Sequence, residues 1–155
     1  MLVSGVAVDK NTARGSVLGV KNEPGIAFRI FNMLAKNQIN VDIIIQSVGR
    51  EDRKDISFTV ARTDLAETLD LLNENKEAFT ASDITCDETV AKVSIIGAGM
   101  VSNPGVAARM FEALANGNIN IKMIATSEIR ITVLIDEQDA NRAMRLVHDA
   151  FDLAD

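Results

Sequence analysis

Two loops of similar sequence carry residue types suited to binding an anion. Asn22-Glu23-Pro24-Gly25-Ile26-Ala27 and Ser102-Asn103-Pro104-Gly105-Val106-Ala107 each lead directly into a stretch with helical periodicity. A helix start presents backbone N–H groups without intrahelical partners, and the helix dipole favours negative charge there. Glycine also lets a ligand approach the backbone closely. One such loop could be an ordinary helix start, but two copies favour sites for a carboxylate.

Polar side chains interrupt the β-branched segments that follow these helices. Asp42 and Gln46 are four residues apart in an otherwise apolar run, so a strand would place both on one face. In the second copy the matching run ends in Thr126-Ser127-Glu128. A solvent-facing strand explains the first pair as well as a binding site does, and an ordinary turn explains the second group. Both interpretations stay open from the sequence.

Residues that would support catalysis or metal binding are not grouped. His148 is the only histidine, and no cysteine stands near it to help form a zinc site. Gly97-Ala98-Gly99 follows an apolar run but lacks the third glycine of a dinucleotide-binding motif, which favours an irregular loop. A phosphate-binding Gly-x4-Gly-Lys-Ser/Thr motif is absent. We therefore expect no metal, no cofactor and no ATP site in this chain.

The chain contains an internal repeat, and it organises the elements that must position these loops. Residues 24–35 match residues 104–115 at an offset of 80, and the match continues from 39–41 to 119–121. After a slip of five residues, 56–60 aligns with 131–135. Agreement that keeps its register across a helix and a strand indicates two copies of one structural unit.

In each copy, the pattern of apolar residues predicts a strand, a helix, a hairpin of two strands and a second helix. This order is the first part of the ferredoxin-like βαββαβ fold. The fold class is therefore α+β, with antiparallel sheets and helices on one face of each. Ser82–Cys86 supplies the last strand of the first module, but no sequence after Phe151 supplies that of the second. We expect Leu2–Val8 to fill that place. The first module, 10–90, would then be inserted in the second, formed by 1–9 and 91–155.

The composition of the chain limits the classes of partner that it suits. Apolar residues make up 47% of the 155 residues, enough for a core, and the net charge is −6. An acidic chain without Trp or Tyr is poorly suited to nucleic acid. We also expect no membrane segment and no signal peptide. The single cysteine, Cys86, predicts a buried, unreactive thiol and a reducing, cytoplasmic location.

Several segments together resemble the C-terminal regulatory region of bacterial aspartate kinases, and the likeness covers essentially the whole chain. They are the two Pro-Gly loops, Ile39-Asn40-Val41-Asp42 followed by Gln46, Thr126-Ser127-Glu128-Ile129-Arg130-Ile131, the opening Val3–Lys10, and Val93–Met100.

The resemblance implies two ACT modules that pair side by side in a homodimer and bind lysine, threonine or both at module interfaces. This binding would inhibit aspartate phosphorylation, the committed step toward lysine, threonine and methionine. The kinase domain, with its ATP site, is missing from the sequence, so we expect no activity from this chain alone and a catalytic domain or subunit as partner. The chain would be either a separately made small subunit or an excised fragment.

The resemblance also implies two effector pockets. One would use Asn22, Gly25, Ile26, Ala27 and Gln46, with Asn120 and Ile121 from the facing module. The other would use Ser102, Asn103, Pro104, Gly105, Val106, Ala107, Thr126, Ser127 and Glu128, with Asp42 from the facing module.

The sequence departs from the family at one position of the first pocket. Many relatives carry Asp where this chain has Asn22, which can accept a hydrogen bond but supplies no charge to an ammonium group. Three alternatives remain: an ACT sensor of another amino-acid enzyme, a ligand-free dimerisation module, and an acylphosphatase-like enzyme. The last is disfavoured because neither Pro-Gly loop contains an arginine.

Overall fold

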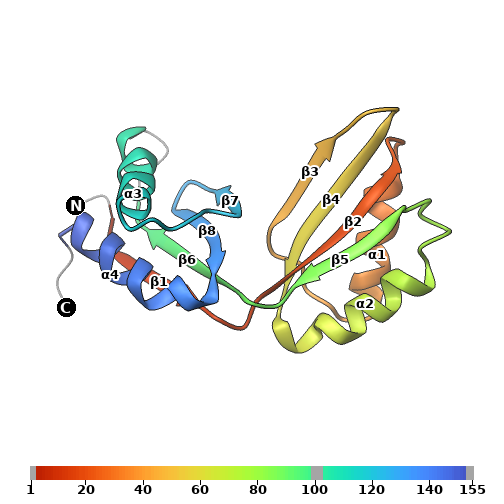
Figure 1. Cartoon of the computed structure of the whole chain (residues 1–155), viewed down its shortest axis with the longest axis horizontal. Helices are drawn as coiled ribbons and strands as arrows, with labels where there is room; N and C mark the ends of the chain where they lie inside the picture. The colour runs from red at the N-terminus through yellow and green to blue at the C-terminus, as the bar shows by residue number, and fades with distance from the viewer. Residues whose placement is uncertain (1–2, 99–102, 153–155) are drawn as a thin grey trace. The chain divides into compact units, whose positions relative to one another are not determined.

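The computed structural model describes residues 3–98 and 103–152. The chain divides into two compact units, one formed by Asn11–Glu88 and the other by Met1–Lys10 together with Thr89–Asp155. Each unit is a four-stranded antiparallel sheet with two α-helices (Figure 1). The predicted fold class, two ferredoxin-like modules with the first inserted in the second, is confirmed.

The unit 11–88 begins with β2 (Ala13–Lys21) and α1 (Ile26–Lys36). The hairpin of β3 (Ile44–Val48) and β4 (Arg53–Val60) follows, then the 3-10 turn η1 (Arg62–Asp64), α2 (Leu65–Glu74) and β5 (Asp83–Asp87). Its sheet has the order β3-β4-β2-β5.

The other unit starts with β1 (Gly5–Asp9) and resumes at β6 (Val90–Ile96). It continues with α3 (Gly105–Asn116), the hairpin of β7 (Met123–Thr126) and β8 (Arg130–Asp136), the 3-10 turn η3 (Glu137–Asp139) and α4 (Ala140–Ala150). Its sheet has the order β1-β6-β8-β7, so β1 fills the edge that the C-terminal sequence leaves open. The strand lies slightly later than the expected Leu2–Val8, and Leu2 is outside the described residues.

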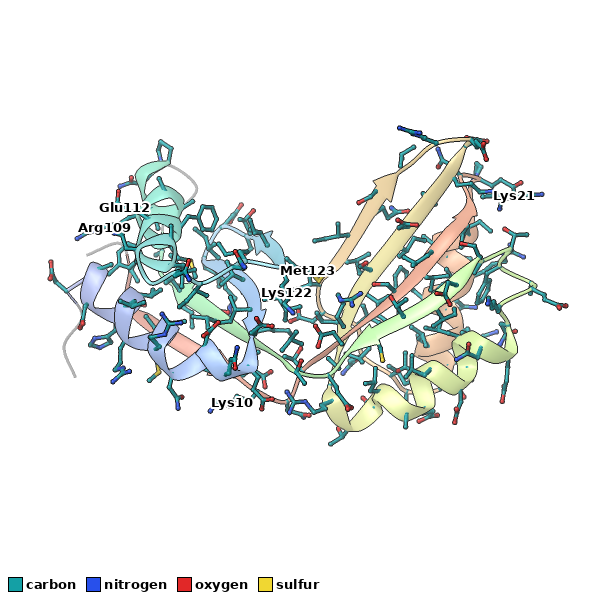
Figure 2. The ribbon with its side chains drawn as sticks, in the orientation of Figure 1. Lys10, Lys21, Arg109, Glu112, Lys122 and Met123 are labelled. Carbon is teal, nitrogen blue, oxygen red and sulfur yellow. The ribbon has the colours of Figure 1, made fainter. Side chains whose placement is uncertain are left out.

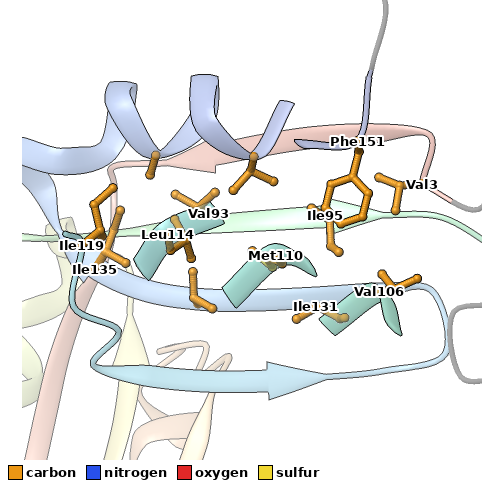
Figure 3. Close-up of a cluster of buried hydrophobic side chains, with 13 residues drawn as sticks. Val3, Val93, Ile95, Val106, Met110, Leu114, Ile119, Ile131, Ile135 and Phe151 are labelled. Carbon is orange, nitrogen blue, oxygen red and sulfur yellow. The ribbon is translucent and has the colours of Figure 1, made fainter. Parts of the chain in front are cut away.

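Apolar side chains on one face of each sheet pack against its helices. In the unit 11–88, Ile30 and Leu34 of α1 meet Phe58 of β4 in a common core, where Phe31 makes an edge-to-face contact with the Phe58 ring at 5.4 Å. In the other unit, Met110 and Leu114 of α3 lie in a core with strand residues such as Val93 and Ile95 (Figure 3). The helical and alternating spacings of these residues explain why the sequence forms these layers.

A pair of hydroxyl groups on neighbouring strands is repeated in both sheets. Ser16 and Ser57 lie opposite each other on β2 and β4, with their Oγ atoms 2.7 Å apart. Ser94 and Thr132 occupy the matching places on β6 and β8, again with a 2.7 Å contact between hydroxyl oxygens. The internal repeat is therefore preserved at the level of individual side-chain contacts.

Helices α1 (C-cap Asn37) and α3 (C-cap Gly117) end in the same way. Gln38 and Asn118 adopt left-handed backbone conformations with φ of 65° and 58°. The N–H groups of the following Ile39 and Ile119 donate to Leu34 and Leu114 carbonyls at 3.0 Å, which completes a Schellman-type helix end. Because Ile39 and Ile119 serve as buried anchors of these ends, β3 and β7 begin only at Ile44 and Met123.

The prediction of a buried thiol at Cys86 was wrong, since Cys86 is exposed. It lies on β5, which is the edge strand of its sheet and pairs only with β2. The residue opposite it in the register is Gly15, which has no side chain to cover the sulfur.

Removal of residues 1–9 should destabilise the unit that contains β6, because β6 would become an edge with unpaired backbone groups. The buried Val3 side chain, which lies beside the Phe151 ring (Figure 3), would also be lost. We expect a lower melting temperature and aggregation in a thermal scan monitored by circular dichroism and light scattering.

Point variants separate the packing contribution from the deletion. Val3→Ala should lower the free energy of unfolding by about 1–2 kcal/mol, since it removes buried methyl groups. Ala7→Ser, at an exposed position of β1, should change it by less than about 0.5 kcal/mol. Unchanged stability of the deletion variant would contradict the role assigned to β1.

Candidate functional site

Helix α1 begins on a left-handed glycine and has no side-chain cap. Gly25 is the N-cap residue with φ of 91° and ψ of −11°, and no side chain hydrogen-bonds to the helix start. Arg29 donates its N–H to the Gly25 carbonyl at 2.9 Å, so the amides of Ile26 and Ala27 lie in the first turn, before this bond. A Cβ built on Gly25 would meet nothing within 4 Å. Open space therefore borders a helix start that favours an anion.

The expected polar partners of this helix start lie on the same unit. Asn22 is exposed in the loop before α1, and its N–H donates to the Asp52 carbonyl at 2.9 Å. Gln46 is exposed on β3, an edge strand bonded only to β4. Among the described residues, no hydrogen bond joins Gln46 to Asn22 or Gly25. The three remain candidates for contacts through a ligand.

Asp42 was expected on the same strand as Gln46, but it lies before β3. Its N–H donates to the Thr59 carbonyl at 3.1 Å, and the side chain is exposed. The neighbouring Ile43 is buried and donates to Thr59 Oγ1 at 3.1 Å. These backbone bonds fix the Asp42 carboxylate at the surface of the sheet, where an ammonium group could reach it.

Helix α3 repeats the uncapped start. Its N-cap is Pro104, no side chain of the described residues caps the helix, and Val106 donates its N–H to the Asn103 carbonyl at 3.2 Å. Gly105 is exposed and Ala107 half-buried, whereas the Val106 side chain belongs to the core. Ser102, the remaining predicted residue of this loop, is outside the described residues.

A cavity of about 390 Å³ borders the start of α3 and includes residues that the sequence did not single out. Arg109 lies over the Phe151 ring at 5.2 Å and forms an ion pair of 3.8 Å with Asp152. Arg29 and Phe79 repeat the stacking in the other unit at 6.0 Å. The coincidence of Arg29 and Arg109 in the repeat was the signal available in the sequence.

The remaining candidates lie around β7. Thr126 ends this strand, and Ser127 forms the turn to β8, where its N–H donates to the Arg130 carbonyl at 2.8 Å. Glu128 is exposed in the same turn. Asn120 is exposed and Ile121 half-buried in the segment that precedes β7. The expected combinations of Gln46 with Asn120 and Ile121, and of Glu128 with Asp42, join residues of two units and stay predictions.

The two units differ in charge at equivalent positions. Asp42 of one unit corresponds in the repeat to Lys122 of the other, which is labelled in Figure 2. Lys122 Nζ lies 2.8 Å from Asp136 Oδ1. Because one position carries an anion and the other a paired cation, the two halves are not equivalent binding surfaces.

Two kinds of site find no support within residues 3–98 and 103–152. These residues contain no cluster of three or more His, Cys, Asp or Glu side chains arranged to hold a metal ion. None of the helices in that part of the chain is long and apolar enough to cross a bilayer.

Comparison with known families agrees with the repeat. A family model described as ACT domain matches residues 16–75 and 93–151, one match in each copy. The chain therefore belongs to the ACT-domain family, with two ACT modules in tandem. Its relatives include aspartokinases and separately solved regulatory subunits of aspartate kinase.

The regulatory subunit of aspartate kinase from Thermus thermophilus, in a ligand-free form, is 41% identical with a TM-score of 0.92, over 97% of this chain and 99% of that one. A solved structure of aspartokinase alpha and beta subunits includes a chain 48% identical, also with a TM-score of 0.92 and the same coverage. Aspartokinase from Helicobacter pylori strain 26695 is 49% identical over 98% of this chain, which spans 37% of that protein.

A more distant solved structure is E. coli aspartokinase III in complex with lysine and aspartate, in the T-state. It is 26% identical with a TM-score of 0.75, over 96% of this chain and 33% of that one.

Substitution of Gly25 by alanine should lower the free energy of unfolding by roughly 1–2 kcal/mol. The surrounding space is open, so the cost comes from the left-handed backbone, which a Cβ disfavours. Gly5→Ala is the matched control, because a Cβ at Gly5 also meets nothing within 4 Å and Gly5 has no positive φ. Chemical denaturation measures both, and equal stability of the two variants would contradict the strained helix start.

Proposed function

We propose that this chain is the effector-binding regulatory part of an aspartate kinase. It binds free lysine, threonine or both and, through a catalytic domain or subunit, lowers the rate of aspartate phosphorylation. The family membership supports the regulatory role, and the aspartokinase III complex with lysine supports the class of ligand. The observation that carries the proposal is the uncapped start of α1 at Gly25, which α3 repeats at Pro104.

The chemistry of a free amino acid suits this surface. Its carboxylate would accept hydrogen bonds from the first-turn amides of α1, where Ile26 and Ala27 lie beside the open space at Gly25. Its α-ammonium group needs an oxygen acceptor, which Gln46 offers on β3 of the same unit. Asp42 lies beside Thr59, at the opposite end of β4 from Arg53, and would instead supply the second predicted pocket, at the start of α3, with the carboxylate that a long cationic side chain requires.

The chain alone would have no kinase activity in this proposal. It spans 37% of the Helicobacter pylori relative and matches a structure described as a regulatory subunit. The solved assembly of alpha and beta subunits supports a catalytic partner made as a separate chain or domain. The reaction itself would take place in the cytoplasm, where free amino acids and ATP are available.

Self-association is part of the proposal. β3 and β7 end their sheets and pair on one side only. Ile44 and Val48 of β3 are 49% and 69% exposed, although they are large apolar residues. A second copy that covered these strands would bury such side chains and satisfy the edge amides.

Isothermal titration with lysine and with threonine tests the function. The wild-type chain should bind at least one of them, and Asp42→Asn should weaken lysine by roughly 1.5–3 kcal/mol, about ten- to a hundredfold, with a smaller effect on threonine. The reason is that only lysine carries a second ammonium group for that carboxylate. Asp70→Ala, an exposed carboxylate on α2, is the charge-matched control and should leave both affinities unchanged.

Absence of binding by the wild-type chain at millimolar concentration of either amino acid would overturn the proposal. If sedimentation then showed a dimer, the chain would be a ligand-free dimerisation module. Equal weakening of lysine and threonine by Asp42→Asn would contradict the role given to its charge.

A further inference from the structure

Strand β2 is interrupted three residues before the loop that leads to α1. Its pairing with β4 shifts register between Val17 and Val20. Within this bulge, Gly19 has a left-handed φ of 67°, and a side chain there would collide with the Ser82 hydroxyl. The bulge therefore requires glycine at this position and leaves both backbone groups of Gly19 outside the regular ladder.

Two charged side chains of β4 bind those backbone groups. Asp55 Oδ1 accepts a hydrogen bond from the Gly19 N–H at 2.9 Å. Arg53 Nη1 donates to the Gly19 carbonyl at 3.2 Å and to the Thr80 carbonyl at 3.3 Å. Hydrogen bonds with one ionised partner are stronger than those between neutral groups, so this pair fixes the bulge from both sides. We call Asp55 and Arg53 the bulge clamp.

The bulge clamp is continuous with the loop before α1. Lys21, which ends β2 and is labelled in Figure 2, donates its N–H to Thr80 Oγ1 at 3.4 Å. Asn22 donates its N–H to the carbonyl of Asp52, the residue directly before Arg53, at 2.9 Å. The segment from Gly19 to Asn22 is thus tied to β4 and its turn at both ends. Gly25, with the helix start, follows three residues later.

In the other unit the equivalent glycine has no left-handed φ and continues the ladder, with no side chain of the described residues bonded to it. The hydroxyl pairs Ser16–Ser57 and Ser94–Thr132 align the two sheets, so Gly97 corresponds to Gly19 and Arg130 to Asp55. Gly97 donates its N–H to the backbone carbonyl of Ile129 at 2.9 Å. A β4 carboxylate in this role is therefore a feature of the unit 11–88 and not a requirement of the fold.

We propose that Asp55 and Arg53 are positioning residues for the amino-acid effector at the start of α1. They do not contact the effector; they hold the Gly19–Asn22 segment so that the amides after Gly25 keep the orientation that a carboxylate needs. This inference rests on the proposed function. A clamp that only stabilises the sheet would change the melting temperature but not the affinity of the folded protein.

Titration of the whole chain with free L-lysine and L-threonine, at a temperature where every variant is folded, distinguishes these roles. Asp55→Ala should weaken binding at the α1 site roughly tenfold, because the Gly19 N–H loses its acceptor. Asp55→Asn keeps an oxygen acceptor and should weaken it less than about threefold. Asp70→Ala again serves as the charge-matched control and should have no effect. Thermal unfolding of each variant provides the separate measure of stability.

The outcomes are separable. If the wild-type chain binds an amino acid and Asp55→Ala binds it equally well, the inference is wrong and the proposed function stands. If the wild-type chain binds neither amino acid, both fail, since no effector site exists to be positioned. Should Asp55→Ala not fold, Asp55→Asn and Arg53→Lys decide: wild-type affinity for Arg53→Lys, or a tenfold loss for Asp55→Asn, would contradict the clamp as described.

Discussion

Helix α1 starts without a side-chain cap, and its first amides need hydrogen-bond acceptors from outside the helix. The left-handed backbone at Gly25 turns the chain into the helix while leaving open space in front of it. Water can hydrogen-bond to a helix start of this kind, but a bound anion stabilises it further, because the helix dipole and the free N–H groups both favour negative charge there. The sheet, the preceding bulge and the β3–β4 hairpin all serve to hold that start at a fixed place.

β1 and β6 belong to one sheet, but the whole unit 11–88 lies between them in the sequence. No single cut in the chain therefore separates the two units. β1 pairs with β6 across the whole inserted unit, from Gly5 opposite Ile96 to Asp9 opposite Lys92. The N-terminal segment therefore belongs to the core of the C-terminal unit, as the burial of Val3 shows. In such a topology, loss of one segment removes a sheet edge from a distant part of the sequence, which couples the stability of the two ends of the chain.

Most of the fold could be predicted from the repeat, because hydrophobic spacing fixes which face of each element is buried. The missed details depend on local packing. Gln38 adopts a left-handed conformation, which is uncommon for residues other than glycine, and β3 begins only after it, at Ile44. Cys86 is exposed because its register partner is Gly15. The 3-10 turn η3 also precedes α4, so the N-cap of that helix is Asp139.

In the candidate site, too, the repeated motifs could be predicted, whereas the contacts that depend on strand register could not. The Pro-Gly loops were visible as a repeated motif, and both lead into uncapped helices. The contacts of Asp55 and Arg53 with Gly19 were not foreseen, although an isolated glycine in a strand pattern signals a bulge. The role of the Asp55 carboxylate can be recognised only once the strand register is known, because the register places it next to Gly19.

Amide hydrogen exchange tests the central claim most directly, because it reports on the backbone groups assigned to the effector carboxylate. Saturating lysine or threonine should slow exchange of the Ile26, Ala27 and Phe28 amides by roughly tenfold or more, since a bound carboxylate protects them from water. Saturation by an amino acid that leaves exchange at these three amides unchanged would contradict the account.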